Sequence, residues 1–191
     1  MNHAQSACKR GYTLVEVLVV VTILGIAGML IIPSLGQADV LRVQGAVRTV
    51  VSDLTYAQAD ALAYQEQRAV LFNVRDNEYT LVAVDETGID PDLNALWDPT
   101  GPDQRYVVSL DNPAYGLSQL AIANFGSESY IVFDELGGPV VGPGSDVPSE
   151  GGSVDVMSTQ ARFRIHISAF TGAITVASVQ MDGGSSEGGS E

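Results

Sequence analysis

Apolar and polar residues follow three successive patterns along the chain. Residues 14–32 are predominantly apolar and contain one charged residue, Glu16. Residues 43–64 repeat apolar side chains every three or four positions, which is typical of one face of an α-helix. From residue 68 onward, short apolar or alternating runs are separated by Gly-, Pro- and Asp-containing segments, which is typical of strands and turns. The order predicts an α+β protein in which a long N-terminal helix precedes an antiparallel β domain.

The first apolar run has the length of a transmembrane helix. Its 19 residues would span about 28 Å as an α-helix, close to the bilayer core of about 30 Å. A buried helix of a soluble core is disfavoured, because such helices are seldom apolar on every face for five turns. A removable secretory signal has a shorter apolar stretch, of about 7–15 residues. We therefore expect a retained single-pass helix over residues 12–33.

The second pattern predicts an amphipathic helix over residues 34–67. Its apolar stripe consists of Val43, Val47, Val50, Leu54, Ala57, Ala61 and Tyr64. The stripe could pair with another chain in a coiled coil, but the strands that follow favour packing on the protein's own sheet. Pro33 separates the two helical segments, and it either ends the helix or kinks it. We expect a kink, because the helical pattern resumes immediately.

The third pattern predicts a β domain over residues 68–180 and a flexible tail over residues 181–191. Alternation is clearest where Phe163, Ile165 and Ile167 alternate with Arg162, Arg164 and His166. Strands are expected at 68–74, 78–84, 105–110, 129–133, 161–168 and 173–179, whereas 117–125 is ambiguous. Residues 85–104 and 142–153 are expected to be loops.

Charge is distributed unevenly. The net charge is −14, which argues against a nucleic-acid-binding surface because such surfaces need Lys and Arg to neutralise phosphates. Lys9 and Arg10 immediately precede the apolar run, whereas residues 34–191 carry 22 acids, seven arginines and no lysine. Cationic flanks remain in the cytoplasm, so the N-terminus is expected there and the acidic domain across the membrane. The single cysteine, Cys8, cannot form an intramolecular disulfide, and no apolar stretch precedes it as lipid attachment would require.

Catalytic and metal-binding motifs are not evident. The chain lacks HExxH, CxxC and a phosphate-binding glycine loop before a helix. His166 lies between arginines on the polar face of a predicted strand, which favours a surface residue over a catalytic base. Asp85, Glu86 and Asp90 could bind calcium, but they lack the spacing of an EF-hand. We expect no enzyme activity, no cofactor and no metal site.

The segment KRGYTLVEVLVVVTILGI resembles the class III signal of type IV pilins and type II secretion pseudopilins. The resemblance implies that residues 1–11 are a leader and that a prepilin peptidase cuts after Gly11. Tyr12 would become the N-methylated mature N-terminus, where the family most often has Phe. Glu16 would become the fifth mature residue, the signature carboxylate of the family, and Pro33 the twenty-second.

Three further segments resemble the H-type minor pseudopilins and related minor pilins. They are LTYAQADALAYQEQRAVLFNV, FDELGGPV and ISAFTGAITV. The resemblance implies a pilin fold, in which two antiparallel sheets pack beside the C-terminal half of the long helix. It is specific in the first 33 residues and loose beyond them.

The implied function is that of a minor pseudopilin or minor pilin, a structural subunit of a type II secretion pseudopilus or type IV pilus. Expected partners are other pilin-like subunits, the prepilin peptidase and the inner-membrane assembly platform. Within the apolar helix, Glu16 would either pair with the Tyr12 amine of a neighbouring copy or simply reach toward the membrane interface. The alternative function is a membrane-tethered extracytoplasmic enzyme or receptor with an unrecognised site. The residues do not distinguish among secretion, pilus and DNA-uptake machines.

Overall fold

The structure is a computed structural model that describes residues 12–85 and 88–181, with the backbone alone for residues 29–38. The chain forms two compact units, Met1–Ala38 and Asp39–Glu191. One helix, α1 (Leu14–Tyr64), begins in the first unit and ends in the second. The division at residue 38 is a few residues beyond the expected boundary at Pro33, and the finer domain limits stay predictions.

Helix α1 continues through Pro33 in the secondary structure, while the expected kink stays a prediction. Among the residues that the structure describes, no helix combines the length and the apolarity needed to cross a membrane.

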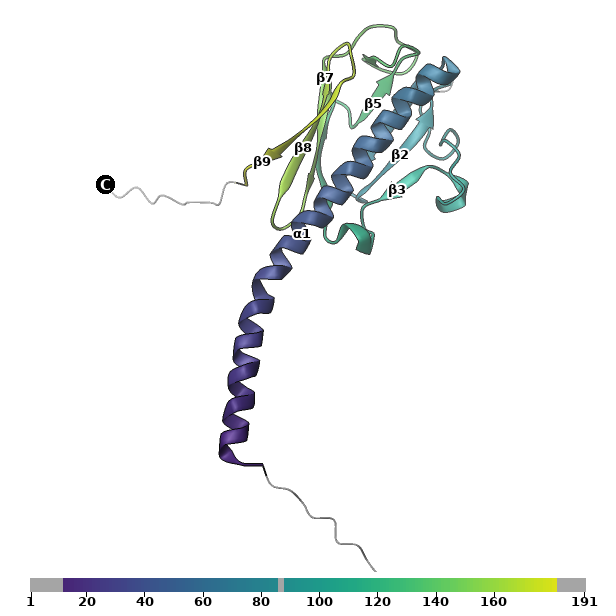
Figure 1. Cartoon of the computed structure of the whole chain (residues 1–191). Helices are drawn as coiled ribbons and strands as arrows, with labels where there is room; N and C mark the ends of the chain where they lie inside the picture. Colours follow the sequence, from purple (N-terminus) through teal and green to yellow (C-terminus); the bar gives the residue numbers. More distant parts are fainter. Residues whose placement is uncertain (1–11, 86–87, 182–191) are drawn as a thin grey trace, which may run out of the picture. The chain divides into compact units, whose positions relative to one another are not determined.

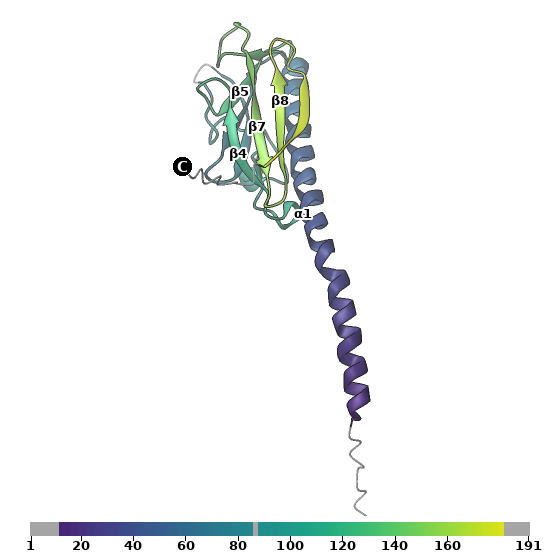
Figure 2. The ribbon, with the colours of Figure 1, turned by 90° about the vertical axis from the view of Figure 1, so that its left-hand side faces the viewer.

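The strands of the second unit form two antiparallel sheets (Figure 1, Figure 2). The five-stranded sheet has the order β3-β2-β1-β5-β6 and the four-stranded sheet the order β4-β7-β8-β9. The strands of the first sheet are β1 (Arg68–Asn73), β2 (Glu78–Ala83), β3 (Val107–Ser109), β5 (Tyr130–Phe133) and β6 (Pro139–Val140). Those of the second are β4 (Gln119–Asn124), β7 (Gly151–Met157), β8 (Arg162–Ser168) and β9 (Ile174–Val179). Two short 3-10 turns, η1 (Pro102–Gln104) and η2 (Pro113–Tyr115), lie in the connections.

The C-terminal half of α1 and both sheets share one hydrophobic core. The helix contributes six residues of the predicted stripe, all buried: Val43, Val47, Val50, Leu54, Ala57 and Ala61. Val70, Leu81 and Phe133 face them from the first sheet, and Val154, Ile165 and Ile167 from the second. Each fully buried Val, Leu, Ile or Phe side chain stabilises the fold by about 1.5–3 kcal/mol before entropy is counted. The predicted packing of the helix on the protein's own sheets is therefore confirmed.

Several sequence expectations need correction. Tyr64, the last residue of the predicted stripe, is 67% exposed. The strand expected at 105–110 is confined to Val107–Ser109, and the ambiguous segment 117–125 contains strand β4. The expected loop at 142–153 overlaps β7, a central strand of the second sheet that the sequence did not indicate. The α+β class itself is confirmed.

Candidate functional site

The first functional feature is the N-terminal end of α1. The Glu16 amide donates a hydrogen bond to Thr13 Oγ1 at 3.2 Å, and the Val17 amide donates to the Thr13 carbonyl at 3.2 Å. Thr13 is therefore the N-cap, and Glu16 occupies the third position of the first turn. Thr followed three residues later by Glu is the spacing of a capping box, a signal that our sequence reasoning missed. A carboxylate at this position also interacts favourably with the positive end of the helix dipole.

Tyr12 and Glu16 lie on one side of the described N-terminal segment. They are four residues apart, and together with Val17, Val20 and Val21 they line an open depression of about 370 Å³. Tyr12 is 82% exposed, and the apolar side chains of residues 14–26 are also exposed in the single chain. This end of the helix therefore offers an apolar surface with one carboxylate to whatever surrounds it. Gly11 lies outside the described residues, so the cleavage position stays a prediction.

A second polar feature anchors the C-terminal half of α1 to the first sheet. Asp53 is buried and accepts hydrogen bonds from the Tyr79 hydroxyl at 2.5 Å and the Tyr106 hydroxyl at 3.0 Å. Burial raises the pKa of Asp53, and the two tyrosine hydrogen bonds offset part of that rise. Burial, together with the nearby Asp53 charge, raises the pKa of both tyrosines. The sequence placed Asp53 outside the apolar stripe and did not indicate this role.

The two central strands of the second sheet, β7 and β8, are joined by a buried carboxylate. Asp155 on β7 is 1% exposed and binds both Arg162 and Arg164 on β8. Arg162 donates through Nε at 2.9 Å and Nη2 at 2.5 Å, and Arg164 through Nε at 2.7 Å and Nη2 at 2.8 Å. Burial raises the pKa of Asp155, but the hydrogen bonds and charges of the arginines outweigh it and hold the pKa below its ordinary value. Four hydrogen bonds from the two arginines to this one carboxylate therefore join the side chains of β7 and β8.

Residues 88–104 of the acidic segment contain more regular turns than the sequence suggested. Asp90 and Asp98 accept hydrogen bonds from the backbone amides of Asp92 and Thr100, as in Asx turns. Arg105 donates to Asp92 at 2.5 Å and lies 3.7 Å from Asp103. Within residues 12–85 and 88–181, no group of three potential metal-ligating side chains comes together. His166 is exposed on β8, as expected for a surface histidine.

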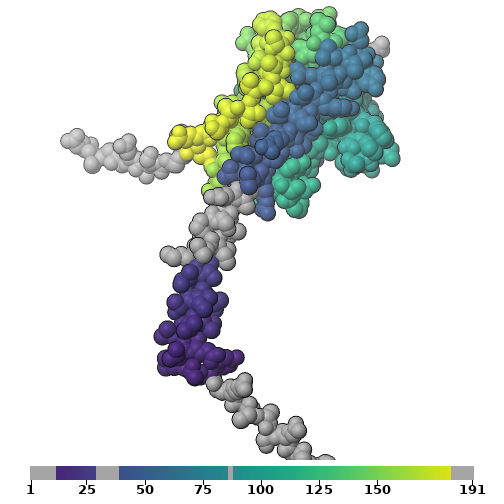
Figure 3. Space-filling view, in the orientation of Figure 1, coloured from purple at the N-terminus to yellow at the C-terminus, as the bar shows by residue number. Residues whose placement is uncertain are grey.

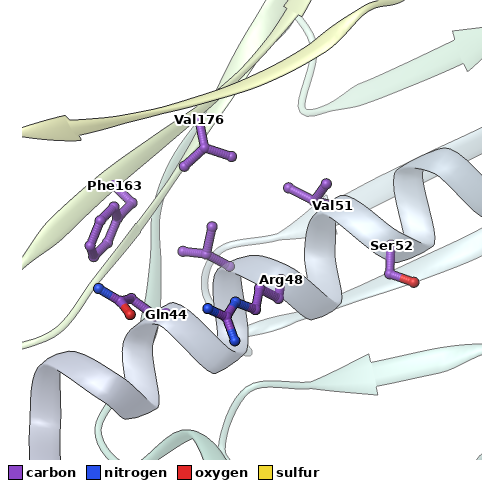
Figure 4. Close-up of a pocket in the computed structure, with 7 residues that line it drawn as sticks. Gln44, Arg48, Val51, Ser52, Phe163 and Val176 are labelled. Carbon is purple, nitrogen blue, oxygen red and sulfur yellow. The ribbon is translucent and has the colours of Figure 1, made fainter.

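The third feature is an open groove between α1 and the second sheet (Figure 4). It has a volume of about 560 Å³ and is lined by Val47, Val51, Phe163 and Val176, with Gln44, Arg48 and Ser52 at its polar margin. Figure 4 shows Phe163 and Val176 on the sheet side, opposite the helical residues. Four of its seven lining residues are apolar, which is typical of a contact surface.

Comparison with known proteins finds a family motif in the N-terminal segment. Residues 6–32 match the family model described as the prokaryotic N-terminal methylation motif. The predicted prepilin-type signal is thereby confirmed, and it supports a protein of the type IV pilin and type II secretion pseudopilin class. The match contains Gly11, Tyr12 and Glu16, but it assigns no role to the individual residues. A search of the curated proteins finds no match.

One solved structure with similarity to the chain is the minor pseudopilin EpsH from the Type 2 Secretion System of Vibrio cholerae. The two are 9% identical, and the superposition has a TM-score of 0.49. It covers 72% of this chain and 97% of that chain.

Proposed function

We propose that the protein is a minor pseudopilin or minor pilin, a structural subunit that assembles with other pilin-like subunits through its N-terminal helix. The observation that carries the proposal is the methylation motif at residues 6–32. The motif overlaps the first half of α1, and the second half of the same helix packs against the β domain, which suits a subunit that assembles through one end of its helix. We assign the chain no catalytic role.

In this proposal, a prepilin peptidase cuts after Gly11 and Tyr12 becomes the methylated N-terminus. Residues 12–33 then hold the chain in the inner membrane as a single pass, with the N-terminus in the cytoplasm and the acidic domain outside it. The assembly platform moves the subunit from the membrane into a filament. The apolar composition of residues 14–32 and the flanking Lys9 and Arg10 support this orientation.

N-terminal mass spectrometry of the chain co-expressed with a prepilin peptidase tests the proposal. A mature chain that begins at methylated Tyr12 is expected, and Gly11→Val should leave the leader attached. Gly45→Val is the matched control, because a Cβ at Gly45 meets no atom within 4 Å. A chain that keeps residues 1–11 in the presence of active peptidase would contradict the proposal and would favour the membrane-tethered receptor or enzyme.

Glu16 is proposed to pair with the new amine of Tyr12 on a neighbouring subunit. Glu16→Gln removes the charge but keeps a side chain that suits a capping box, whereas Thr13→Ala removes the cap and keeps the charge. If the pairing matters, Glu16→Gln should abolish incorporation into filaments and Thr13→Ala should reduce it only mildly. Incorporation of Glu16→Gln at the wild-type level would refute the pairing, and equal loss in both variants would assign Glu16 to helix capping.

A further inference from the structure

The two sheets have four edges, and three of them carry features that discourage pairing with another strand. Strand β3 has three residues, and β6 has two, one of which is Pro139. Strand β4 contains a register irregularity between Leu120 and Ile122. Short strands, proline and bulges are the usual means by which proteins protect sheet edges.

Strand β9 has none of these features. It pairs with β8 over six residues without a shift in register. Its sequence, ITVASV, contains no proline, glycine or charge and is rich in β-branched residues. In the described part of the chain, no strand or bridge pairs with its outer side. Among the strands that the structure describes, β9 therefore has the one long, regular and unprotected edge.

The outward-facing backbone groups of β9 can be identified from the turn that precedes it. The Ser168 amide donates to the Ala173 carbonyl at 2.9 Å, which makes this a hydrogen-bonded pair. Hydrogen-bonded pairs alternate along an antiparallel ladder, so Thr175 and Ala177 bond inward to β8. The amides and carbonyls of Ile174, Val176 and Ser178 consequently point toward the free edge.

The same strand forms one wall of the groove described above. Val176 is 47% exposed even though it pairs with Ile165, which is fully buried, because α1 covers β8 but leaves the face of β9 open. Figure 3 shows β9 in yellow beside the blue C-terminal half of α1. A strand added to the edge would direct every second side chain over the groove, toward Val176 and the helix.

Arg48 indicates which chemistry the added strand should carry. Four of the seven arginines of the β domain and its helix bind carboxylates, namely Arg68, Arg105, Arg162 and Arg164. Arg48 is exposed at the groove, and no ion pair joins it to any residue of the described segments despite the net charge of −14. A carboxylate on the incoming strand would complement it.

We propose that the free edge of β9 accepts an extended segment of another protein subunit by strand addition. The segment would carry apolar side chains and one carboxylate on alternate positions of a single face. The apolar side chains would enter the groove beside Val176 and Val51, and the carboxylate would bind Arg48. Backbone hydrogen bonds to Val176 would provide affinity, and the groove would provide specificity. The inference does not depend on the cleavage at Gly11 or on assembly through the N-terminal helix.

The test uses the full chain in detergent micelles and the acetylated, amidated peptide Val-Thr-Glu-Thr-Val-Thr. Binding is measured by isothermal titration calorimetry and by hydrogen exchange of the outward-facing amides of Ile174, Val176 and Ser178. The peptide should bind and protect these amides. A version with Lys in place of Glu should bind about threefold to fivefold more weakly, as expected for a partly exposed ion pair. A version with alternate amides N-methylated should not bind, because it lacks the ladder donors.

Two protein variants and one control locate the contact. Arg48→Glu should reverse the preference from the Glu peptide to the Lys peptide, whereas Arg75→Glu makes the same change of charge in the exposed β1–β2 turn and should not. Val176→Pro removes an outward amide without removing a bond to β8, and it should weaken binding about tenfold. Unchanged near-ultraviolet circular dichroism would show that each variant is folded.

Four outcomes would overturn the proposal. The first is that neither the Glu peptide nor the Lys peptide binds. The second is that the N-methylated peptide binds as tightly as the parent peptide. If protection of the Ile174, Val176 and Ser178 amides rises with protein concentration alone, the edge pairs with a second copy of this chain. If these amides are protected without peptide and lose that protection when residues 182–191 are deleted, the edge of β9 pairs with the chain's own tail.

Discussion

The Asp155 network gives the sharpest quantitative prediction. Replacing Asp155 with Asn keeps the shape of the side chain but removes the charge that faces Arg162 and Arg164. Hydrogen bonds to charged groups contribute about 1.5–3 kcal/mol, and breaking a fully buried ion pair costs about 3–5 kcal/mol. The arginine side chains are 26% and 45% exposed, so water can solvate them after the change and the lower range applies. We expect Asp155→Asn to lower the free energy of unfolding by about 2 kcal/mol.

The pH dependence distinguishes this charge effect from a packing effect. The pKa of Asp155 is lower in the folded than in the unfolded chain, so its stabilisation is fully present above the unfolded pKa of about 4. It is lost as the pH falls through the folded pKa. The difference between wild type and Asp155→Asn should therefore be constant from pH 5 to 7 and shrink below about pH 4.

Urea denaturation followed by circular dichroism at several pH values measures the difference. Asp146→Asn is the matched control, because Asp146 is exposed and no hydrogen bond or ion pair joins its side chain to another of the described residues. A difference between wild type and Asp155→Asn that does not change between pH 7 and pH 2.5 would refute the electrostatic account. A difference equal to that of Asp146→Asn would show that the arginines do not stabilise the folded chain through this acid.

Substitutions at three other positions probe the packing of α1. Leu54→Ala empties a fully buried site and should lower the free energy of unfolding by about 3 kcal/mol in urea denaturation. Gln58 Nε2 donates to the carbonyls of Gly137 and Gly172, both at 3.0 Å. Gln58→Glu should lower the free energy of unfolding more than Gln58→Ala does, because the glutamate carboxylate would face two carbonyl oxygens. Burial raises the pKa of Asp53 in the folded chain above its unfolded value of about 4. The wild type therefore loses stability as the pH rises from about 4 through the folded pKa. Over that pH interval, urea denaturation should show the free energy of unfolding of Asp53→Asn rising relative to that of the wild type.

The helical part of the fold could be predicted because its signals are local. The stripe from Val43 to Ala61 repeats at the helical period, and each of its six predicted members is buried. Tyr64 fits the same period but is exposed at the last turn. Periodicity states which face a residue occupies, but not how far along the helix the sheets extend.

The sequence did not indicate strand β7, because glycine occurs both in flexible linkers and where two strands approach closely. Gly151 and Gly152 stand in a run that resembles a flexible linker, yet both lie in the strand. Gly151 has a φ of 75°, and a Cβ at Gly152 would clash with the Phe125 ring and the Asn124 carbonyl. These glycines permit close approach between strands, which only the three-dimensional structure reveals.

The buried acids could not be predicted, because their partners are distant in the sequence. Asp53 is joined to Tyr79 and Tyr106 across the boundary between helix and sheet. Asp155 lies in the missed strand, and its pairing with Arg164 depends on the β7–β8 register. A residue pattern shows that an acid lies among apolar residues, but it does not identify the hydrogen-bond donors that make burial of its carboxylate tolerable.

Glu16 shows how far local interactions can account for a charge in an apolar segment. If residues 12–33 cross the bilayer as proposed, a carboxylate costs about 2.5–3.5 kcal/mol at mid-helix and less near the interface. The favourable interaction with the helix N-terminus contributes about 0.3–1 kcal/mol. The Thr13 cap holds the first turn in place but satisfies the Glu16 amide rather than its carboxylate. The local terms therefore offset only part of the cost unless the side chain lies at the interface, and a deeper position requires a nearby cation. Since residues 12–28 contain no Lys or Arg, the amine that cleavage would create at Tyr12 of a neighbouring copy is the cation that we propose as the partner of Glu16.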